Sequence, residues 1–207
     1  MDGEVTGNHS SVQEKYNFQR TQPKVFCIGL NKTGTTSFGE ALKILGYRRH
    51  GWRDGSGMLT MRACERKFQQ LFTTAYEFDA FEDLPWPLAF AELDQHFPNA
   101  KFVLTMRASD DVWLESIGSH IRRRGMWIGH KAIYGALSPD IDAKCYRDTY
   151  NRHNEAVRKH FAGRPGKLLE MCFEHGDGWK KICPFLGIPE IPKAAFPHAN
   201  ARPDATD

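Results

Sequence analysis

The sequence predicts an α/β protein in which a mostly parallel sheet is flanked by helices in three layers. Short apolar and β-branched runs alternate with longer segments of helical periodicity, and the apolar runs are continuous, as in strands buried on both faces. Of the 207 residues, 41% are hydrophobic and 12% aromatic, which is enough for one domain with a substantial core. We expect this domain over residues 24–200, after a disordered arm over 1–23 and before a tail over 201–207.

The first expected strand and helix enclose a loop of small residues. Residues 25–30 form an apolar run of the length of a buried strand, and residues 31–37 read Asn-Lys-Thr-Gly-Thr-Thr-Ser. After this loop, apolar residues recur at helical spacing over 38–45, and Thr36 or Ser37 is the expected N-cap. Strand, loop and helix in this order predict an anion site, because free backbone N–H groups and the positive end of the helix dipole converge there.

A lysine adds a full positive charge to this loop. The expected anion ligands share the loop and the first helical turn, and they are Lys32, Thr33, Gly34, Thr35, Thr36 and Ser37. A Walker loop reads G-x-x-x-x-G-K-[ST], whereas here Gly29 and Gly34 have that spacing but the lysine precedes the second glycine. This order weakens the nucleoside-triphosphatase interpretation. The structural alternative is a helix cap with a solvated lysine.

Further strands and helices alternate along the rest of the chain. Strands are expected at 75–85, 102–106 and 167–173, and helices at 58–74, 86–97, 110–124, 140–161 and 177–185. The carboxyl ends of parallel strands meet at one edge of a sheet, where ligands bind in open α/β folds. We therefore expect the Lys32 loop, the pair Glu82 and Asp83, and Arg107 to converge at that edge.

The composition argues against several classes of protein. A formal net charge of +3 is too small to indicate a nucleic-acid-binding protein, although it suits a polyanionic cofactor. The five cysteines are scattered and odd in number, so neither a disulfide framework nor a CxxC metal site is expected. The nine histidines show no ligand spacing for a metal ion. No apolar stretch has the length of a membrane span, and residues 1–23 lack the apolar core of a signal peptide, which predicts a soluble cytoplasmic protein.

Several separated stretches together resemble the small bacterial-type sulfotransferases. They are Lys32 to Ser37, Asp83-Leu84-Pro85-Trp86, Arg107 with Trp113 and Ser116, Gly176-Asp177-Gly178-Trp179, and Phe196-Pro197-His198-Ala199-Asn200. The resemblance covers most of residues 24–200. It implies the P-loop NTPase-like sulfotransferase fold, and it implies 3′-phosphoadenosine 5′-phosphosulfate (PAPS) as the donor, with adenosine 3′,5′-bisphosphate as the product and no metal ion.

The resemblance also implies roles for particular residues. In the family, an arginine after the third strand and a serine on the next helix bind the 3′-phosphate of the donor, and these positions correspond to Arg107 and Ser116. The serine usually follows the arginine by eight positions, whereas here it follows by nine. Either the loop absorbs one extra residue or Ser109 replaces part of the contact.

Relatives often carry a base after the second strand, and Asp83 occupies the corresponding place here. Such a base is needed because an alcohol is a poor nucleophile until its proton is removed. Burial beside Trp86 would raise the pKa of Asp83 toward a useful range. The alternatives are that Asp83 only caps the turn before Pro85, or that Glu82 is the base.

The resulting prediction is a sulfotransferase whose acceptor is a hydroxyl or amine of a carbohydrate, lipid or small alcohol. Two rivals remain: a nucleotide or small-molecule kinase, and a catalytically degenerate nucleotide-binding module. Possible acceptor contacts are the aromatic residues Trp52, Trp86, Trp127 and Tyr134 and the arginines Arg122, Arg123 and Arg124. The alternatives are that the aromatic residues are core and the arginines a solvated helix face. The oligomeric state is left open.

Overall fold

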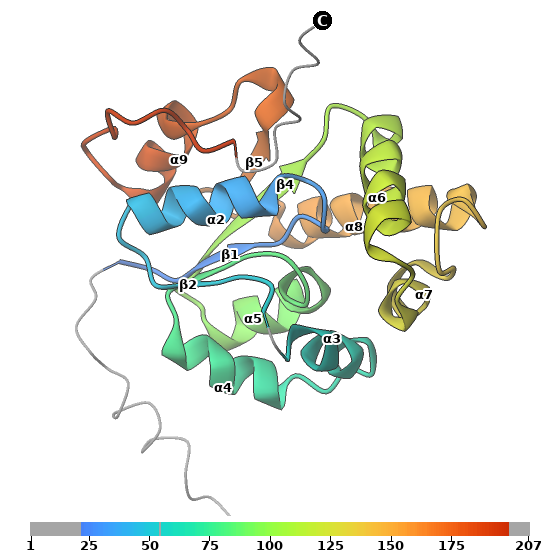
Figure 1. The fold of residues 1–207 in the computed structure, drawn as a ribbon. Coiled ribbons are helices and arrows are strands. Elements are labelled where there is room, and N and C mark those ends of the chain that lie inside the picture. The colour runs from blue at the N-terminus through green and yellow to red at the C-terminus, as the bar shows by residue number, and fades with distance from the viewer. Residues whose placement is uncertain (1–21, 54, 199–207) are drawn as a thin grey trace, which may run out of the picture.

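The computed structural model describes residues 22–53 and 55–198, in which five strands form a parallel sheet (Figure 1). The strand order is β2-β3-β1-β4-β5, and every neighbouring pair is parallel. The strands are β1 (Val25–Cys27), β2 (Arg49–His50), β3 (Ala80–Phe81), β4 (Lys101–Met106) and β5 (Leu168–Cys172). The predicted α/β class with a parallel sheet is confirmed.

Helices cover both faces of the sheet. The α-helices are α2 (Thr35–Ile44), α3 (Ser56–Cys64), α4 (Gln69–Glu77), α5 (Phe90–His96), α6 (Asp110–Arg124), α7 (Ile128–Tyr134), α8 (Ala143–Phe161) and α9 (Trp179–Leu186), and the short 3₁₀ helices are η1 (Trp86–Ala89) and η2 (Phe173–His175). In Figure 1, α2 and α9 lie above the sheet, α3, α4 and α5 lie below it, and α6 and α7 lie to the right. The three-layer arrangement is therefore as predicted.

The first strand shows why continuous apolar runs form the centre of this sheet. Successive side chains of a strand point to opposite faces. Val25 and Cys27 accordingly pack in a cluster with residues of α2 and α9, whereas Phe26 and Ile28 pack in a cluster with residues of α3, α4, α5 and α8. All four side chains are fully buried. Both faces of β1 must therefore be apolar.

A third apolar cluster lies where α6, α7 and α8 meet the end of β1. Its buried members are Leu30, Trp113, Ile117, Ile121, Tyr134, Ala136, Tyr146 and Tyr150. Trp113 stacks on Tyr150 with ring centroids 4.4 Å apart, and Tyr134 stacks on Tyr146 at the same distance. This cluster fixes α6 and α7 beside the loop that follows β1.

Two of the expected elements are corrected by the structure. The single helix expected at 58–74 is divided into α3 and α4, and between them Arg66 adopts a left-handed conformation with φ 59°. The strand expected at 75–85 is only Ala80–Phe81, because residues 75–77 complete α4. Leu71 and Ala75 are fully buried on the inner face of α4, so core packing favours helix there.

The sequence prediction also omitted three elements, β2, α7 and the short 3₁₀ helix η2. The other expected helices and strands are present, with bounds within a few residues of the prediction. Apart from residues 22–23, the predicted arm over 1–23 lies outside the described residues, as does the tail over 201–207. None of the described helices has the length and apolar character needed to cross a membrane.

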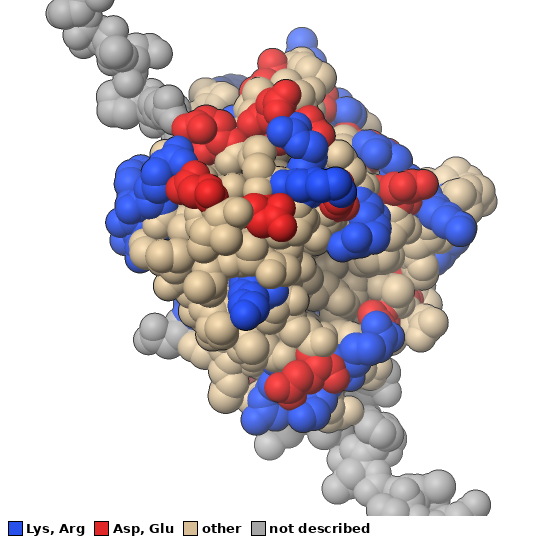
Figure 2. All heavy atoms as spheres, turned by 90° about the vertical axis from the view of Figure 1, so that its right-hand side faces the viewer, with Lys and Arg blue, Asp and Glu red and all other residues tan. Residues whose placement is uncertain are grey.

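The face at the right of Figure 1 carries charges of both signs. Figure 2 shows lysine and arginine side chains interleaved with aspartate and glutamate at the top and bottom of this face. Between them lies a largely uncharged area. The face is therefore not a continuous basic surface.

One buried carboxylate links three elements at the opposite end of the strands. Asp94 in α5 is 5% exposed, and it accepts hydrogen bonds from His160 Nε2 at 2.9 Å and Arg164 Nη2 at 2.9 Å. Lys167 Nζ lies 3.1 Å from its Oδ1. Burial alone would raise the pKa of Asp94, but the bonds from Arg164, His160 and Lys167 outweigh it and lower that pKa to about 2.

We expect Asp94→Asn to lower the free energy of unfolding at pH 7 by about 2–4 kcal/mol, because the cations around it lose their buried partner. Arg164 is 40% exposed, so solvent screening places the loss at the lower end. The folded pKa lies below the unfolded one, so the contribution is complete above about pH 4 and is lost toward pH 2. Urea unfolding between pH 2 and 7 measures both effects. Asp148→Asn in the exposed pair with Lys144 is the control; equal losses in both variants would contradict the prediction.

Candidate active site

The loop between β1 and α2 has an unusual backbone. Lys32 and Gly34 both adopt left-handed conformations, with φ 71° and φ 92°. Gly34 is the N-cap of α2, so the expected N-cap at Thr36 or Ser37 is wrong, and both residues lie in the first helical turn. A Cβ atom on Gly34 would lie 2.4 Å from Cδ2 of Phe173, so both the conformation and the packing require glycine.

Hydrogen bonds fix this loop to the body of the protein. The Thr33 hydroxyl donates to the Leu30 carbonyl at 2.6 Å and lies 2.7 Å from the Thr105 hydroxyl in β4. Trp113 Nε1 in α6 donates to the Asn31 carbonyl at 2.9 Å, and the Tyr134 hydroxyl in α7 donates to Asn31 Oδ1. Because its hydroxyl is engaged inside the protein, Thr33 can offer an anion only its backbone N–H group.

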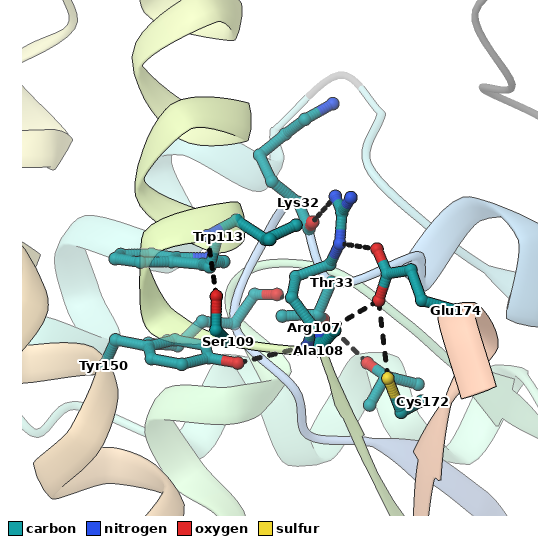
Figure 3. A network of polar contacts seen from close by, with 12 residues as sticks. Lys32, Thr33, Arg107, Ala108, Ser109, Trp113, Tyr150, Cys172 and Glu174 are labelled. Atoms are coloured by element: carbon teal, nitrogen blue, oxygen red, sulfur yellow. Dashed lines mark hydrogen bonds and ion pairs between the residues drawn. The ribbon is translucent and has the colours of Figure 1, made fainter.

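The Lys32 side chain leaves the loop in a different direction from its carbonyl group. Figure 3 shows the ammonium group away from the network that surrounds the carbonyl oxygen. Burial lowers the pKa of Lys32; Asp83 opposes this shift, and the charges of Arg123, Arg107 and Arg124 add to it. Lys32 is thus a partly buried ammonium group among other cations, which is an environment suited to a polyanion.

Two neighbouring carboxylates follow β3 and point to different partners. Asp83 adopts a left-handed conformation with φ 69°, and its Oδ1 accepts the Leu84 N–H at 2.8 Å. Burial raises the pKa of Asp83. The Leu84 N–H, the charges of Lys32 and Arg49, and the Thr35 hydroxyl act in the opposite direction but do not cancel this shift. Asp83 therefore lies beside the loop and the start of α2.

Glu82, in contrast, faces β2. Its side chain is 2% exposed, and Oε1 accepts hydrogen bonds from Arg49 Nε at 2.9 Å and Nη2 at 2.7 Å. Burial and the nearby Asp83 raise the pKa of Glu82 to about 7, even though Arg49 acts in the opposite direction. A Cβ on Gly51 would lie 2.0 Å from Glu82 Oε1, so the carboxylate is tightly enclosed.

Arg107 lies at the end of β4 and contacts the same loop. Its Nη1 donates to the Lys32 carbonyl at 3.2 Å, and its Nε donates to Glu174 Oε1 (Figure 3). Its backbone N–H donates to the Tyr150 hydroxyl at 3.1 Å. The structure thus brings Lys32, Asp83 and Arg107 to the carboxyl edge of three neighbouring strands, β3, β1 and β4.

The two candidate serines occupy different positions on α6. The Ser109 hydroxyl is the N-cap of α6 and accepts the Val112 N–H at 3.2 Å. Ser116 lies one turn after Trp113 and one turn before His120 along α6. In the part of the chain that the structure describes, no hydrogen bond joins Ser116 to Arg107. Ser109 is therefore engaged as a cap of α6, and the role of Ser116 stays a prediction.

Comparison with known proteins assigns the family. The model of the sulfotransferase domain family matches residues 24–139 and 128–205. The chain belongs to this family. A crystal structure of a sulfotransferase from Alicyclobacillus acidocaldarius is similar to this sulfotransferase with a TM-score of 0.56 and 16% identity, over 89% of this chain and 88% of that one. Ava biosynthesis cluster protein M of Aspergillus versicolor is 27% identical over 213 residues, which cover 84% of this chain and 80% of that protein. The resemblance seen in the sequence and the predicted enzyme class are confirmed.

Sequence reasoning missed His120 near Lys32 of this sulfotransferase and did not connect Arg123 and Arg124 with Lys32. Burial lowers the pKa of His120 to about 4, and the charges of Lys32, His130, Arg123 and Arg124 act in the same direction. One alternative from the sequence was that Arg122, Arg123 and Arg124 form a solvated helix face. This is true of Arg122, which pairs with Glu115 and Asp140 on the surface. Arg123 and Arg124, however, contribute to the potential at Lys32. Their helical position after Trp113 is the signal that could have identified them.

The aromatic acceptor candidates of the sulfotransferase divide into two groups. Trp86 and Tyr134 are 0% and 1% exposed and belong to the core. Trp52 is 51% exposed and packs edge to face against Trp127, with ring centroids 5.6 Å apart. Trp127 in turn lies against His130, with ring centroids 5.5 Å apart. Of these four candidates, Trp52 and Trp127 are therefore the two that do not belong to the core. Among the described residues, no group of three or more His, Cys, Asp or Glu side chains is placed to hold a metal ion.

Proposed function

We propose that this sulfotransferase transfers a sulfuryl group from PAPS to a hydroxyl, or less readily an amine, of a carbohydrate, lipid or small alcohol. The observation that carries the proposal is the meeting of Lys32, Asp83 and Arg107 at one edge of the sheet, beside the start of α2. A helix N-terminus and a lysine favour the 5′-phosphosulfate. A guanidinium group is suited to a second phosphate, the 3′-phosphate.

The residues then divide the reaction between them. As the acceptor oxygen bonds to sulfur, the bond between sulfur and the bridging oxygen of the donor breaks, and negative charge grows on that oxygen. Lys32 and the N–H groups of residues 33–37 stabilise this charge. Asp83 receives the acceptor proton, and its raised pKa makes it a stronger base than an exposed aspartate. Arg107 and Ser116 hold the 3′-phosphate.

Two observations favour a small acceptor over a polyanionic one. The face beside α6 and α7 carries charges of both signs around a largely uncharged area, whereas a polyanion favours a continuous basic surface (Figure 2). In addition, the relative from Aspergillus versicolor is named for a biosynthesis cluster. Both observations support a small acceptor, and the exposed Trp52 ring, which packs against Trp127, is the surface proposed for it.

The proposal is tested by turnover with labelled PAPS and a panel of carbohydrates, lipids, phenols, small alcohols and amines, followed by mass spectrometry. Label is expected in one acceptor class, with adenosine 3′,5′-bisphosphate released in equal amount. Calorimetry is run in parallel with that bisphosphate and with ATP and Mg²⁺. Tight binding of ATP and Mg²⁺ alone would favour a kinase, and bisphosphate binding without turnover on any acceptor would favour a degenerate module.

We expect Arg107→Ala to weaken adenosine 3′,5′-bisphosphate by roughly tenfold or more, because a charge-assisted contact to the 3′-phosphate is lost. The affinity for 5′-AMP should change little, since that nucleotide lacks the 3′-phosphate. Calorimetry with both nucleotides measures the difference. Arg122→Ala, which removes an arginine paired with Glu115 and Asp140 on the surface, is the matched control. Equal losses for both nucleotides would show that Arg107 only stabilises the loop.

A further inference from the structure

Glu174 lies in η2, directly after β5, and its carboxylate is fully engaged beside Arg107. Oε1 accepts from Arg107 Nε, and Oε2 accepts from the Ala108 N–H at 3.0 Å and from Cys172 Sγ at 3.3 Å (Figure 3). Its side chain is 34% exposed, similar to the 26% of Arg107. The carboxylate is thus held by one backbone N–H group and one thiol as well as by the guanidinium group.

These contacts fix the plane of the Arg107 guanidinium. A guanidinium group has five N–H donors in a rigid fork. Nε is taken by Glu174, and one hydrogen of Nη1 is directed to the Lys32 carbonyl at 3.2 Å. Among the described residues, Nη2 of Arg107 makes no hydrogen bond, so this nitrogen remains available. Glu174 therefore occupies the Nε side of the guanidinium group. The end formed by Nη1 and Nη2 is left to bind a phosphate.

The same contacts fix Arg107 relative to the 5′-phosphosulfate loop. Arg107 bonds the carbonyl group of Lys32, and its own N–H is bonded to Tyr150. Tyr150 stacks on Trp113, which donates to the carbonyl of Asn31. The distance between the guanidinium group and the loop is therefore set by protein contacts before a nucleotide arrives.

We propose that Glu174 is a positioning residue that orders Arg107 for the 3′-phosphate and so sets the preference for nucleotides that carry this group. The inference rests on the proposed function of Arg107. An arginine that is already ordered loses less rotamer freedom on binding, which favours affinity. The negative charge of Glu174 acts in the opposite direction, because it repels the phosphate. The sign of the effect on removing Glu174 therefore separates positioning from competition.

The test is calorimetry on the full chain with adenosine 3′,5′-bisphosphate and 5′-AMP. The variants are Glu174→Ala, Glu174→Gln and the control Glu170→Ala, which removes a carboxylate of β5 that pairs with Arg158 away from the loop. We expect Glu174→Ala to reduce the ratio of the two affinities roughly tenfold, as expected for losing one charge-assisted contact. Glu174→Gln should retain most of the ratio, because its amide oxygen still accepts from Arg107 Nε. Glu170→Ala should match the wild type.

The affinity for 5′-AMP reports whether each variant is folded. If the wild-type protein does not prefer the bisphosphate, the proposed function itself fails, whatever the variants do. If the wild type prefers it and Glu174→Ala keeps the full ratio, Glu174 only stabilises the fold and the inference is overturned. Tighter bisphosphate binding in both Glu174 variants would overturn it too, because Glu174 would then compete with the phosphate.

Discussion

Replacing Lys32 with alanine is expected to reduce the turnover number by about a hundred- to a thousandfold, the range for losing one donor to a developing oxyanion. The fold should be unaffected. The Lys32 carbonyl, which bonds Arg107, is retained, and the left-handed backbone at φ 71° disfavours lysine and alanine alike. The ammonium group acts on charge that grows during the transfer, so the change should appear in kcat more than in nucleotide affinity.

The measurement is a single-turnover rate with saturating PAPS and an acceptor found in the screen. The control for removing a lysine charge is Lys43→Ala, because Lys43 lies in the last turn of α2, at the end of the helix away from the loop, and its side chain is 70% exposed. It should keep the wild-type rate. A Lys32→Ala enzyme with wild-type turnover would remove Lys32 from the mechanism.

Asp83→Asn is expected to reduce the transfer rate by roughly a hundred- to ten-thousandfold, which is the usual contribution of a positioned general base. The amide keeps the shape of the side chain, so the affinity for adenosine 3′,5′-bisphosphate should remain. Because a base acts when deprotonated and burial raises the pKa of Asp83, the wild-type rate should rise with pH and level off above that pKa. The Asn variant should lack this rise.

Glu82→Gln is the control for Asp83→Asn, because the two carboxylates are neighbours that face different partners. Glu82 is bound by Arg49, so its substitution should alter stability more than the transfer rate. If Glu82→Gln is inactive and Asp83→Asn active, Glu82 is the base. If both variants are active, the base lies elsewhere, and His50 and His198 are the next residues to test. His50 is 4% exposed, and burial lowers its pKa to about 4.

The parts of the fold that could be predicted are those where local pattern and tertiary packing agree. β4 is apolar or β-branched from Phe102 to Met106, and α6 has the cap Ser109 directly before it. The convergence of Lys32, Asp83 and Arg107 was predictable because parallel strands end at one edge. The strand β2 was not predictable, because Arg49 and His50 are polar and form a strand only by pairing with β3.

The contacts that could not be predicted join distant parts of the chain. Glu174 meets Arg107 across 67 positions, and Tyr150 meets it across 43. Neither residue has a local signal, because its role depends on how β5 and α8 pack beside β4 rather than on its neighbours in sequence. The division of α3 from α4 was hidden for a similar reason, since the turn at Arg66 falls within a continuous helical pattern.

The short strand β2 also bears on how copies of this protein meet one another. β2 is the last strand on one side of the sheet and is only two residues long, Arg49–His50. A long, flat edge strand is a template for pairing with another chain, with the risk of aggregation, and short charged edge strands reduce that risk. The Arg49 side chain, turned inward to Glu82, adds charge at this edge. The edge at β2 is therefore poorly suited to extending the sheet into a second molecule.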